Sequence, residues 1–366
     1  MMERIGGKVI KFGHYAVVGL ALVVTVSARS VSAAEQPFYA GKTIRIIAGF
    51  AAGGTIDLRA RLIARYLPKW IPGNPTIIVQ NMTGAGGQIA ANYVFSVATP
   101  DGLTMLHSPT GPVMNTFLEP DSVKYDVRRI SVLWVQEDSW LTAFNAKATK
   151  IKKAEDMLRT AGKLRVGGSG ASSPRSLRPK LALELFGADH TWVTGYRGSA
   201  DLLVALERGE IHLFEEPMAG YKPIIQPREK DGTIVVLWQT GILTLEETFK
   251  RSEFIPHIPT LDEVLPKEKK AGPAWEAWKA LVVPQAFQGM VSLPAGMLPD
   301  RIAILTHALE KMTQDPPYRE EHQKVLGQPA DALFGESADR VVKTAIKRLF
   351  EDYQGGVRYL RDLAKK

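Results

Sequence analysis

The sequence predicts an α/β protein built as two lobes, and three observations support this. An apolar strand, a turn with two glycines and a helix follow one another over residues 43–67. The same order recurs at residues 76–95, and a fresh α/β series begins at residue 163. Such alternation indicates mostly parallel sheets with helices on their faces. The 366-residue chain also exceeds one typical domain, which favours two lobes.

The first strand-to-helix unit brings a helix N-terminus to the carboxyl end of a strand. Its strand carries Ile44, Ile46 and Ile47, and its turn contains Gly53 and Gly54. The next segment has apolar residues at helical spacing, namely Ile56, Ala60, Ile63 and Leu67. The free N–H groups and the positive dipole end of such a helix attract anions. The alternative is a tight turn that serves packing only.

The next units place more small residues at the same edge. A strand at residues 76–81, a glycine turn at 84–87 and a helix at 88–95 precede a strand at 103–107. The loop that follows contains Ser108 and Thr110. Ligands bind at the carboxyl edge of open α/β sheets, so this loop is a candidate binding segment.

The second lobe is expected between two crossings of the chain, near residue 140 and at residues 280–283. We predict lobe 1 from residues 35–139 and 280–366, and lobe 2 from residues 140–279, with the C-terminal helices covering lobe 1. Lobe 2 is predicted to hold a helix at 153–161 and strands at 163–167, 191–194, 210–214 and 233–238. Its own glycine-rich turn, residues 167–173, precedes a helix expected to begin at Pro179 and to end at Phe186.

The N-terminal residues 1–34 have the pattern of a cleavable export signal. Arg4, Lys8 and Lys11 precede an apolar run at residues 16–26 and small residues suited to cleavage at 31–34. The mature protein is therefore expected outside the cytoplasm. The alternative is an uncleaved anchor, although the apolar run is short for a membrane span.

Composition excludes several classes of function. The chain has no cysteine, hence no disulfide framework or zinc-thiolate site. Its formal net charge of +8 comes without a basic and aromatic stretch typical of nucleic-acid binding. The seven histidines show no metal-binding spacing, and no nucleotide-binding or serine-nucleophile motif is present. We therefore expect no cofactor, no metal, no nucleic-acid partner and no catalytic residues.

Six short motifs occur in an order that resembles a known family. They are residues 44–47 with 53–57 and Arg61; Asn81 with 84–87; 100–104; 195–198 with 207–210; 258–263; and 293–296 with 315–316. The sequence resembles the periplasmic solute-binding proteins of tripartite tricarboxylate transporters, the Bordetella uptake gene family. It departs from the family in the first turn, where Gly49 and Ala52 stand in place of prolines.

The resemblance implies a type II periplasmic-binding-protein fold, with two α/β lobes joined by two crossing strands. It also implies that a small organic carboxylate is held between the lobes and delivered to the integral membrane subunits of a transporter. The receptor is expected to be a monomer. Two alternative functions are a periplasmic ligand sensor for a signalling partner and an α/β enzyme.

The resemblance, together with the two glycine turns, gives the expected ligand-binding residues. One wall would be the turn after the first strand and the other would be the serine-rich turn of lobe 2, with Tyr196 and Arg197 beside the same cleft. Asp57 is expected to brace its own turn. Arg175, Arg178 and Lys180 are candidates for meeting the far end of the ligand. The full set is Phe50, Ala51, Ala52, Gly53, Gly54, Thr55, Asp57, Ser108, Thr110, Ser169, Gly170, Ala171, Ser172, Ser173, Tyr196 and Arg197.

Overall fold

The computed structural model describes residues 36–160, 162–170, 172–244, 247–287 and 289–365. The expected export signal, residues 1–34, lies outside the described residues. Residues 37–366 form one compact unit. Within the described ranges, no helix has both the length and the apolar character needed to cross a membrane.

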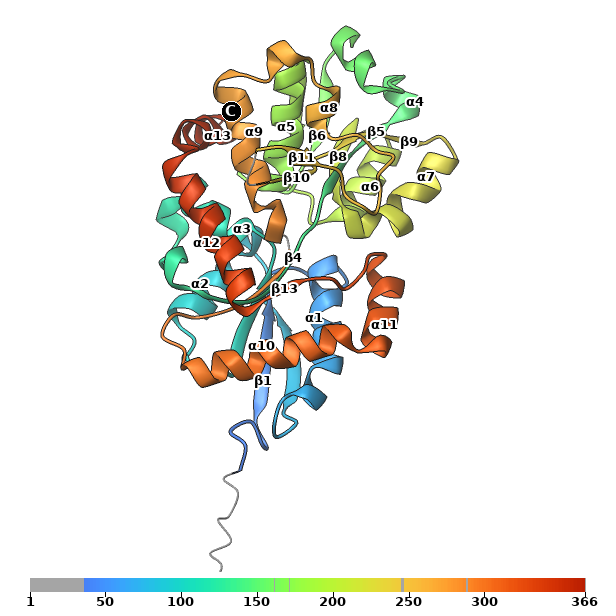
Figure 1. The fold of residues 1–366 in the computed structure, drawn as a ribbon. Coiled ribbons are helices and arrows are strands. Elements are labelled where there is room, and N and C mark those ends of the chain that lie inside the picture. Colours follow the sequence, from blue (N-terminus) through green and yellow to red (C-terminus); the bar gives the residue numbers. More distant parts are fainter. Residues whose placement is uncertain (1–35, 161, 171, 245–246, 288, 366) are drawn as a thin grey trace, which may run out of the picture. The chain divides into compact units, whose positions relative to one another are not determined.

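The first sheet has six strands in the order β13-β4-β12-β3-β1-β2 (Figure 1). Strand β1 pairs in parallel with β2 and β3, whereas β12 is antiparallel to β3 and β4, and β13 is antiparallel to β4. The sheet is therefore mixed. Its strands are β1 (Thr43–Ala48), β2 (Thr76–Asn81), β3 (Thr104–Ser108), β4 (Ser131–Gln136), β12 (Gly289–Leu293) and β13 (Leu333–Phe334).

The second sheet has five strands in the order β7-β6-β8-β5-β9. Strand β6 is parallel to β7 and β8, and β5 is antiparallel to β8 and β9. A separate antiparallel pair joins β10 to β11. The strands are β5 (Trp140–Asn145), β6 (Leu164–Gly167), β7 (His190–Val193), β8 (Leu213–Pro217), β9 (Ile234–Gln239), β10 (Ile242–Leu243) and β11 (Phe249–Lys250).

Helices cover both sheets (Figure 1). The α-helices are α1 (Thr55–Tyr66), α2 (Gln88–Ser96), α3 (Gly111–Leu118), α4 (Ala146–Thr149), α5 (Pro174–Phe186), α6 (Ser199–Glu207), α7 (Gln226–Lys230), α8 (Leu261–Val264), α9 (Gly272–Val282), α10 (Pro299–Gln314), α11 (Pro316–Leu326), α12 (Gly335–Glu351) and α13 (Gln354–Lys365). The short 3-10 segments are η1 (Pro68–Trp70), η2 (Ala85–Gly87), η3 (Pro120–Ser122), η4 (Val127–Arg129), η5 (Ala154–Arg159), η6 (Met218–Gly220), η8 (Lys267–Lys269) and η9 (Val283–Phe287), and η7 (Tyr221–Ile225) is a π-helix.

The first strand-to-helix unit forms as its apolar spacing predicts. Ile44 and Ile46 of β1 and Ala60 and Ile63 of α1 are fully buried in one apolar cluster. Burial of one face of α1 against the sheet fixes where its first turn lies. The two separate sheets and the helices that cover them confirm the two-lobe α/β fold expected from the alternating pattern.

The return passage between the sheets is helical, which differs from the expected strand. The chain leaves the first sheet at residues 137–139, between β4 and β5, and returns through α9 and η9 to β12. Residues 280–283 belong to the end of α9 and the start of η9. The reason is a helical apolar stripe, since Trp275, Trp278 and Leu281 of α9 are buried on one face.

The C-terminal helices do not cover the first lobe alone. Helix α12 packs against β4, but α13 packs against α9 and α5. The division of the chain into residues 35–139 with 280–366 and residues 140–279 remains a prediction.

Helix α5 begins five residues earlier than expected. Pro174 stands at its first position and Pro179 lies inside the helix. A proline removes one backbone hydrogen bond. The helix nevertheless continues through Pro179, because Leu177 and Leu181 on either side are fully buried in the core.

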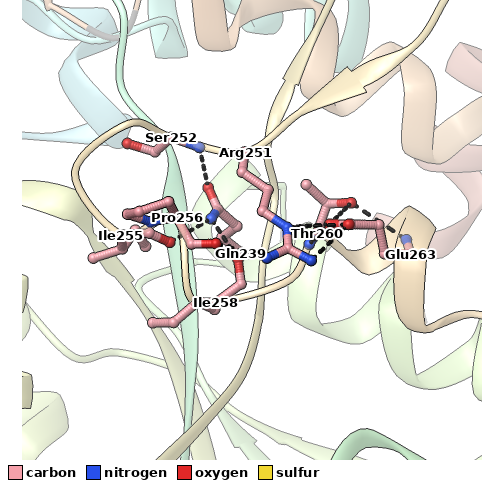
Figure 2. A network of polar contacts seen from close by, with 8 residues as sticks. All are labelled: Gln239, Arg251, Ser252, Ile255, Pro256, Ile258, Thr260 and Glu263. Atoms are coloured by element: carbon pink, nitrogen blue, oxygen red, sulfur yellow. Dashed lines mark hydrogen bonds and ion pairs between the residues drawn. The ribbon is translucent and has the colours of Figure 1, made fainter.

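A buried glutamine at the end of β9, Gln239, holds the loop of residues 252–258 (Figure 2). The Gln239 side chain accepts the Ser252 N–H at 2.7 Å and donates to the carbonyl oxygens of Ile255 and Ile258 at 3.2 and 2.7 Å. Its Oε1 also accepts the Ser139 hydroxyl at 3.1 Å. Residues 252–258 are thereby tied to the start of β5.

Two buried histidines in the first lobe carry their proton on Nδ1. Nδ1 of His107 lies 3.1 Å from the Met290 carbonyl oxygen, and Nδ1 of His322 lies 2.9 Å from that of Gln328. A carbonyl oxygen only accepts, so each Nδ1 is the donor. Burial, and then the positive charge of Arg59, lower the pKa of His107 to about 3 and that of His322 to about 4.

We predict that His322 makes the fold labile in acid. Between about pH 6.5 and 4 the unfolded chain binds a proton at this histidine and the folded chain does not, so stability falls as pH falls. The free energy of unfolding should fall by about 3 kcal/mol over this pH range. Denaturant unfolding at pH 4.5 and 7 should show a smaller pH difference for His322→Gln than for the wild type. His307→Gln, at an exposed position of α10, serves as the control, and equal pH dependence in both variants would contradict the prediction.

Candidate functional site

The turn between β1 and α1 is organised by the carboxylate of Asp57. This side chain is buried, and its Oδ2 accepts the Gly53 N–H and the Arg61 Nε–H, both at 2.9 Å. Its Oδ1 accepts the Asn81 side-chain amide, also at 2.9 Å. Burial acts to raise the pKa of Asp57, but these hydrogen bonds more than offset it and lower the pKa below its ordinary value. The carboxylate is therefore ionised at neutral pH.

Asp57 and Asn81 together set the course of the turn. The Asn81 amide also donates to the Phe50 carbonyl oxygen at 2.9 Å. The arrangement agrees with the expectation that Asp57 braces its own turn. The Gly53 amide already serves Asp57, and the Gly54 amide lies 3.4 Å from the Ala51 carbonyl oxygen.

The next backbone donors along the chain belong to the first turn of α1. The first N–H groups of an α-helix have no intrahelical acceptor, and here they belong to Thr55 and Ile56 at the start of α1. Ala51, Ala52, Gly53 and Gly54 are exposed beside them, and Phe50 and Thr55 are half-buried. The helix has no side-chain N-cap, so its N-terminus is open to an anion.

Three loops at the carboxyl edge of the first sheet pack backbone against backbone. A Cβ atom added at Gly49 would lie 3.1 Å from Cα of Gly87, and one added at Gly111 would lie 2.7 Å from the Gly86 carbonyl oxygen. Larger residues would push these loops apart. The turns after β1, β2 and β3 therefore form one continuous surface.

Ser108 and Thr110 lie inside that surface and are buried. The Ser108 hydroxyl has no hydrogen-bond partner among the described residues. Thr110 stands at the N-terminus of α3. Neither side chain is exposed in this structure.

The serine-rich turn of the second lobe is a compact loop before α5. The Ser169 hydroxyl donates to that of Ser173 at 3.2 Å, and the Gly170 N–H lies 3.4 Å from the Ser176 hydroxyl. The Ser172 hydroxyl donates to the Glu119 carboxylate at the end of α3. This contact joins the second turn to the first lobe. Ala171 lies outside the described residues.

The cations that follow this turn brace the second lobe. Arg178 makes a buried ion pair with Glu215 at 2.7 Å, and Arg175 pairs with Glu216 at 2.9 Å. The Ser199 hydroxyl completes that arrangement, because it donates to Glu216 at 2.9 Å.

Lys180 is buried as well, and its Nζ donates to the Leu363 carbonyl oxygen at 2.8 Å. The charged groups of all three cations are thus engaged by the protein.

Tyr196 and Arg197 lie after β7, and Tyr196 contacts the serine-rich turn through its backbone. The Tyr196 N–H lies 3.4 Å from the Gly168 carbonyl oxygen. The Arg197 side chain is 87 % exposed and pairs with Asp201 at 2.9 Å. A shallow surface pocket of about 310 Å³ is lined by Tyr196, Asp201, Val204, Ala205, Arg208 and Glu210.

The sequence analysis assigned no role to the residues that hold these turns in place. Asn81 and Arg61 occur in its motifs, and the spacing of Arg61 four residues after Asp57 is the usual signal of a helical ion pair. Glu119 and Ser176 had no local signal. No group of side chains suited to hold a metal ion is present among the described residues.

Replacing Asn81 should loosen the first turn. Asn81→Ala removes the donor to Asp57 and to the Phe50 carbonyl oxygen, and we expect a loss of about 1–3 kcal/mol in the free energy of unfolding. Denaturant unfolding measures this. Gln80→Ala, at the preceding exposed position of β2, is the matched control. An equally small change in the free energy of unfolding for both substitutions would show that Asn81 does not stabilise the turn.

Comparison with known proteins places this chain in a family. Residues 60–326 match the family described as "Tripartite tricarboxylate transporter family receptor". A UPF0065 protein of Agrobacterium vitis is 24% identical over 336 residues, which cover 90% of this chain and 89% of that protein.

Two solved structures from Rhodopseudomonas palustris share the fold. One, determined with adipate, has a TM-score of 0.64 and 22% identity, and the match covers 88% of this chain and 97% of that one. The other, MatC with bound malate, has a TM-score of 0.62 and 20% identity, with 88% and 99% coverage. The family match spans more than half of the 366 residues. This chain belongs to the tripartite tricarboxylate transporter receptor family.

Proposed function

We propose that this protein is an extracytoplasmic receptor that binds a small organic carboxylate and delivers it to the membrane subunits of a tripartite tricarboxylate transporter. The observation that carries the proposal is the pair of strand-to-helix turns, one before α1 and one before α5, each at the carboxyl edge of its sheet. Two structural relatives hold malate and adipate, which are both dicarboxylates. The proposed ligand belongs to the same chemical class.

The carboxylate is proposed to bind at the N-terminus of α1. The free amides of Thr55 and Ile56 and the exposed backbone of Gly54 supply donors without a charged side chain. The far end of the ligand would meet the hydroxyl and amide groups of Ser169 and Ser173. Hydrogen bonds to a charged group contribute about 1.5–3 kcal/mol each, and micromolar affinity requires about 8 kcal/mol in total.

The cations near the second turn contribute to this site indirectly. Arg175 and Arg178 are paired with Glu216 and Glu215, so they hold the turn in shape and leave recognition to hydroxyls and amides. Tyr196 contacts the serine-rich turn through the backbone and is the remaining candidate side chain beside it.

A sensory role is the alternative with the same ligand. A periplasmic receptor of this fold can report its ligand to a signalling protein instead of a transporter. Identification of the membrane protein that binds the ligand-loaded receptor separates the two roles. The α/β enzyme is less well supported, because the family is one of receptors.

Gly54 provides a clean test of the anion site. Its φ and ψ of −79° and 166° suit any residue, and an added Cβ would lie 3.5 Å from the Ala51 carbonyl oxygen, an ordinary contact. Gly54→Val should therefore fold normally and obstruct the approach of a carboxylate. We expect at least about a tenfold loss of affinity for adipate or malate by calorimetry, equivalent to about 1.4 kcal/mol.

Two controls make this test specific. Thr43→Val lies at the other end of β1, at an exposed position, and should bind as the wild type does. The neutral diamides of the same acids should bind poorly. Equal binding of acids and diamides, or full affinity in Gly54→Val, would disprove the anion site.

We further propose a periplasmic monomer whose mature chain begins near Ala34 or Glu35. The basic start and the apolar run of residues 16–26 motivate this. N-terminal sequencing and light scattering of protein released by osmotic shock should give that start and a monomer mass. Recovery of the chain in the membrane fraction with Met1 intact would instead support the uncleaved anchor.

A further inference from the structure

The serine-rich turn of the second lobe has an acidic partner from the first lobe. The Ser172 hydroxyl donates to the carboxylate of Glu119, the residue that follows the last residue of α3. Both residues are half-buried, so a molecule bound beside the turn can reach them. A carboxylate of the protein therefore lies next to the turn that is proposed to meet the far end of the ligand.

The charge of Glu119 is not neutralised by a partner. Within the described ranges, the hydroxyl of Ser172 is the only side-chain donor to its carboxylate, and no cation pairs with it. An ionised carboxylate has two oxygens and about four lone pairs that accept hydrogen bonds. One hydroxyl leaves most of that capacity unused, so Glu119 can accept a further hydrogen bond from a bound molecule.

The cations of α5 do not offset this charge. Arg175 and Arg178 each pair with a carboxylate of β8, at 2.9 and 2.7 Å. Lys180 lies further along the helix, and its Nζ donates to the Leu363 carbonyl oxygen at 2.8 Å. The two arginines are matched by the two acids of β8, so Glu119 adds a negative charge beside the serine-rich turn.

The hydroxyl groups of the turn are partly committed to the protein. Ser169 donates to Ser173 at 3.2 Å, and Ser172 donates to Glu119. A hydroxyl that donates inside the protein still has lone pairs that accept hydrogen bonds. Together with the carboxylate, the side chains of the turn thus offer more acceptors than donors. Such a surface suits a ligand group that donates hydrogen bonds.

We propose that Glu119 selects ligands whose far end is a hydrogen-bond donor, an alcohol or an ammonium group, over ligands with a second carboxylate at that end. The inference rests on the proposed function and narrows it, because the first carboxylate would still bind at the N-terminus of α1. A second carboxylate near Glu119 would meet a like charge in a half-buried place, which lowers affinity. A diacid such as adipate still binds through its first carboxylate, but more weakly than a hydroxy or amino acid of the same length.

Four acids of equal chain length provide the direct test. Hexanoate, 6-hydroxyhexanoate, 6-aminohexanoate and adipate differ only in the group at the far end. In calorimetry at pH 7.5, the wild type should bind the hydroxy and amino acids at least about tenfold more tightly than adipate. Hexanoate, which neither donates nor repels, should lie between them. Adipate that binds as tightly as the hydroxy and amino acids would overturn the proposal.

Two substitutions of Glu119 separate its charge from its size. Glu119→Gln removes the charge at a half-buried position and keeps an acceptor for Ser172, so the fold should be retained. Adipate should gain affinity in this variant and 6-aminohexanoate should lose it, which brings the two within about threefold of each other. Glu119→Asp, which keeps the charge, should still disfavour adipate.

Asp121→Asn is the matched control, because it removes an equal charge at an exposed position two residues later. It should keep the wild-type order of the four acids. The same order and spacing of affinities in Glu119→Gln as in the wild type, or an equal change in Asp121→Asn, would contradict a selective role of Glu119.

Gly54→Val distinguishes this inference from the proposed anion site. It should weaken all four acids by a similar factor and leave their order unchanged, because each presents a carboxylate to α1. If the acids bind the wild type in the wrong order but weaken together in Gly54→Val, the role of Glu119 is wrong and the anion site stands. If Gly54→Val keeps full affinity while Glu119→Gln changes the order, the anion site is wrong and selection by Glu119 stands. Failure of all four acids to bind the wild type would overturn both.

Discussion

The carboxylate of Asp57 is the interaction on which the candidate site depends. It is buried at the start of α1, and it collects donors from its own turn, its own helix and the end of β2. Three charge-assisted hydrogen bonds compensate for its burial and fix the turn before α1 in one conformation. Because the Gly53 amide is one of those donors, an anion bound at this turn as we propose would use the amides that come later, at Thr55 and Ile56. In that proposal, a residue that repels anions defines where an anion can bind.

The sequence predicted those parts of the fold whose signals are local. The strand at residues 76–81 and the helix that begins at Gln88 lie where the periodicity placed them, because apolar spacing and glycine turns act over a few residues. The predicted start of α5 at Pro179 is wrong, because buried neighbours hold Pro179 inside the helix. The helical return passage was also missed, although the stripe of Trp275, Trp278 and Leu281 carried the signal.

The site was predictable as a set of turns but not as a set of contacts. The glycines after β1, β2 and β3 marked the carboxyl edge of the sheet. Glycine is required there because the loops approach each other too closely for a side chain. The hydrogen bond between Ser172 and Glu119 joins residues far apart in the chain, and no local pattern indicates such a pair. Arg59 did leave a signal, because it occupies the position three residues after Ile56 on the apolar face of α1. A charge at a position that must be buried needs a function or a partner.

The two lobes handle buried charge in different ways. In the second lobe, Arg178 and Glu215 satisfy each other directly, and Arg175, Glu216 and Ser199 form a closed set of hydrogen bonds. Around Asp57 the first turn is equally well satisfied. Such turns are stiff, because moving any member breaks several hydrogen bonds at once. In α1, by contrast, two donors of the buried Arg59 have no hydrogen-bond partner among the residues that the structure describes. If the receptor closes on its ligand as proposed, stiff turns of this kind favour movement of whole lobes over reshaping of the turns.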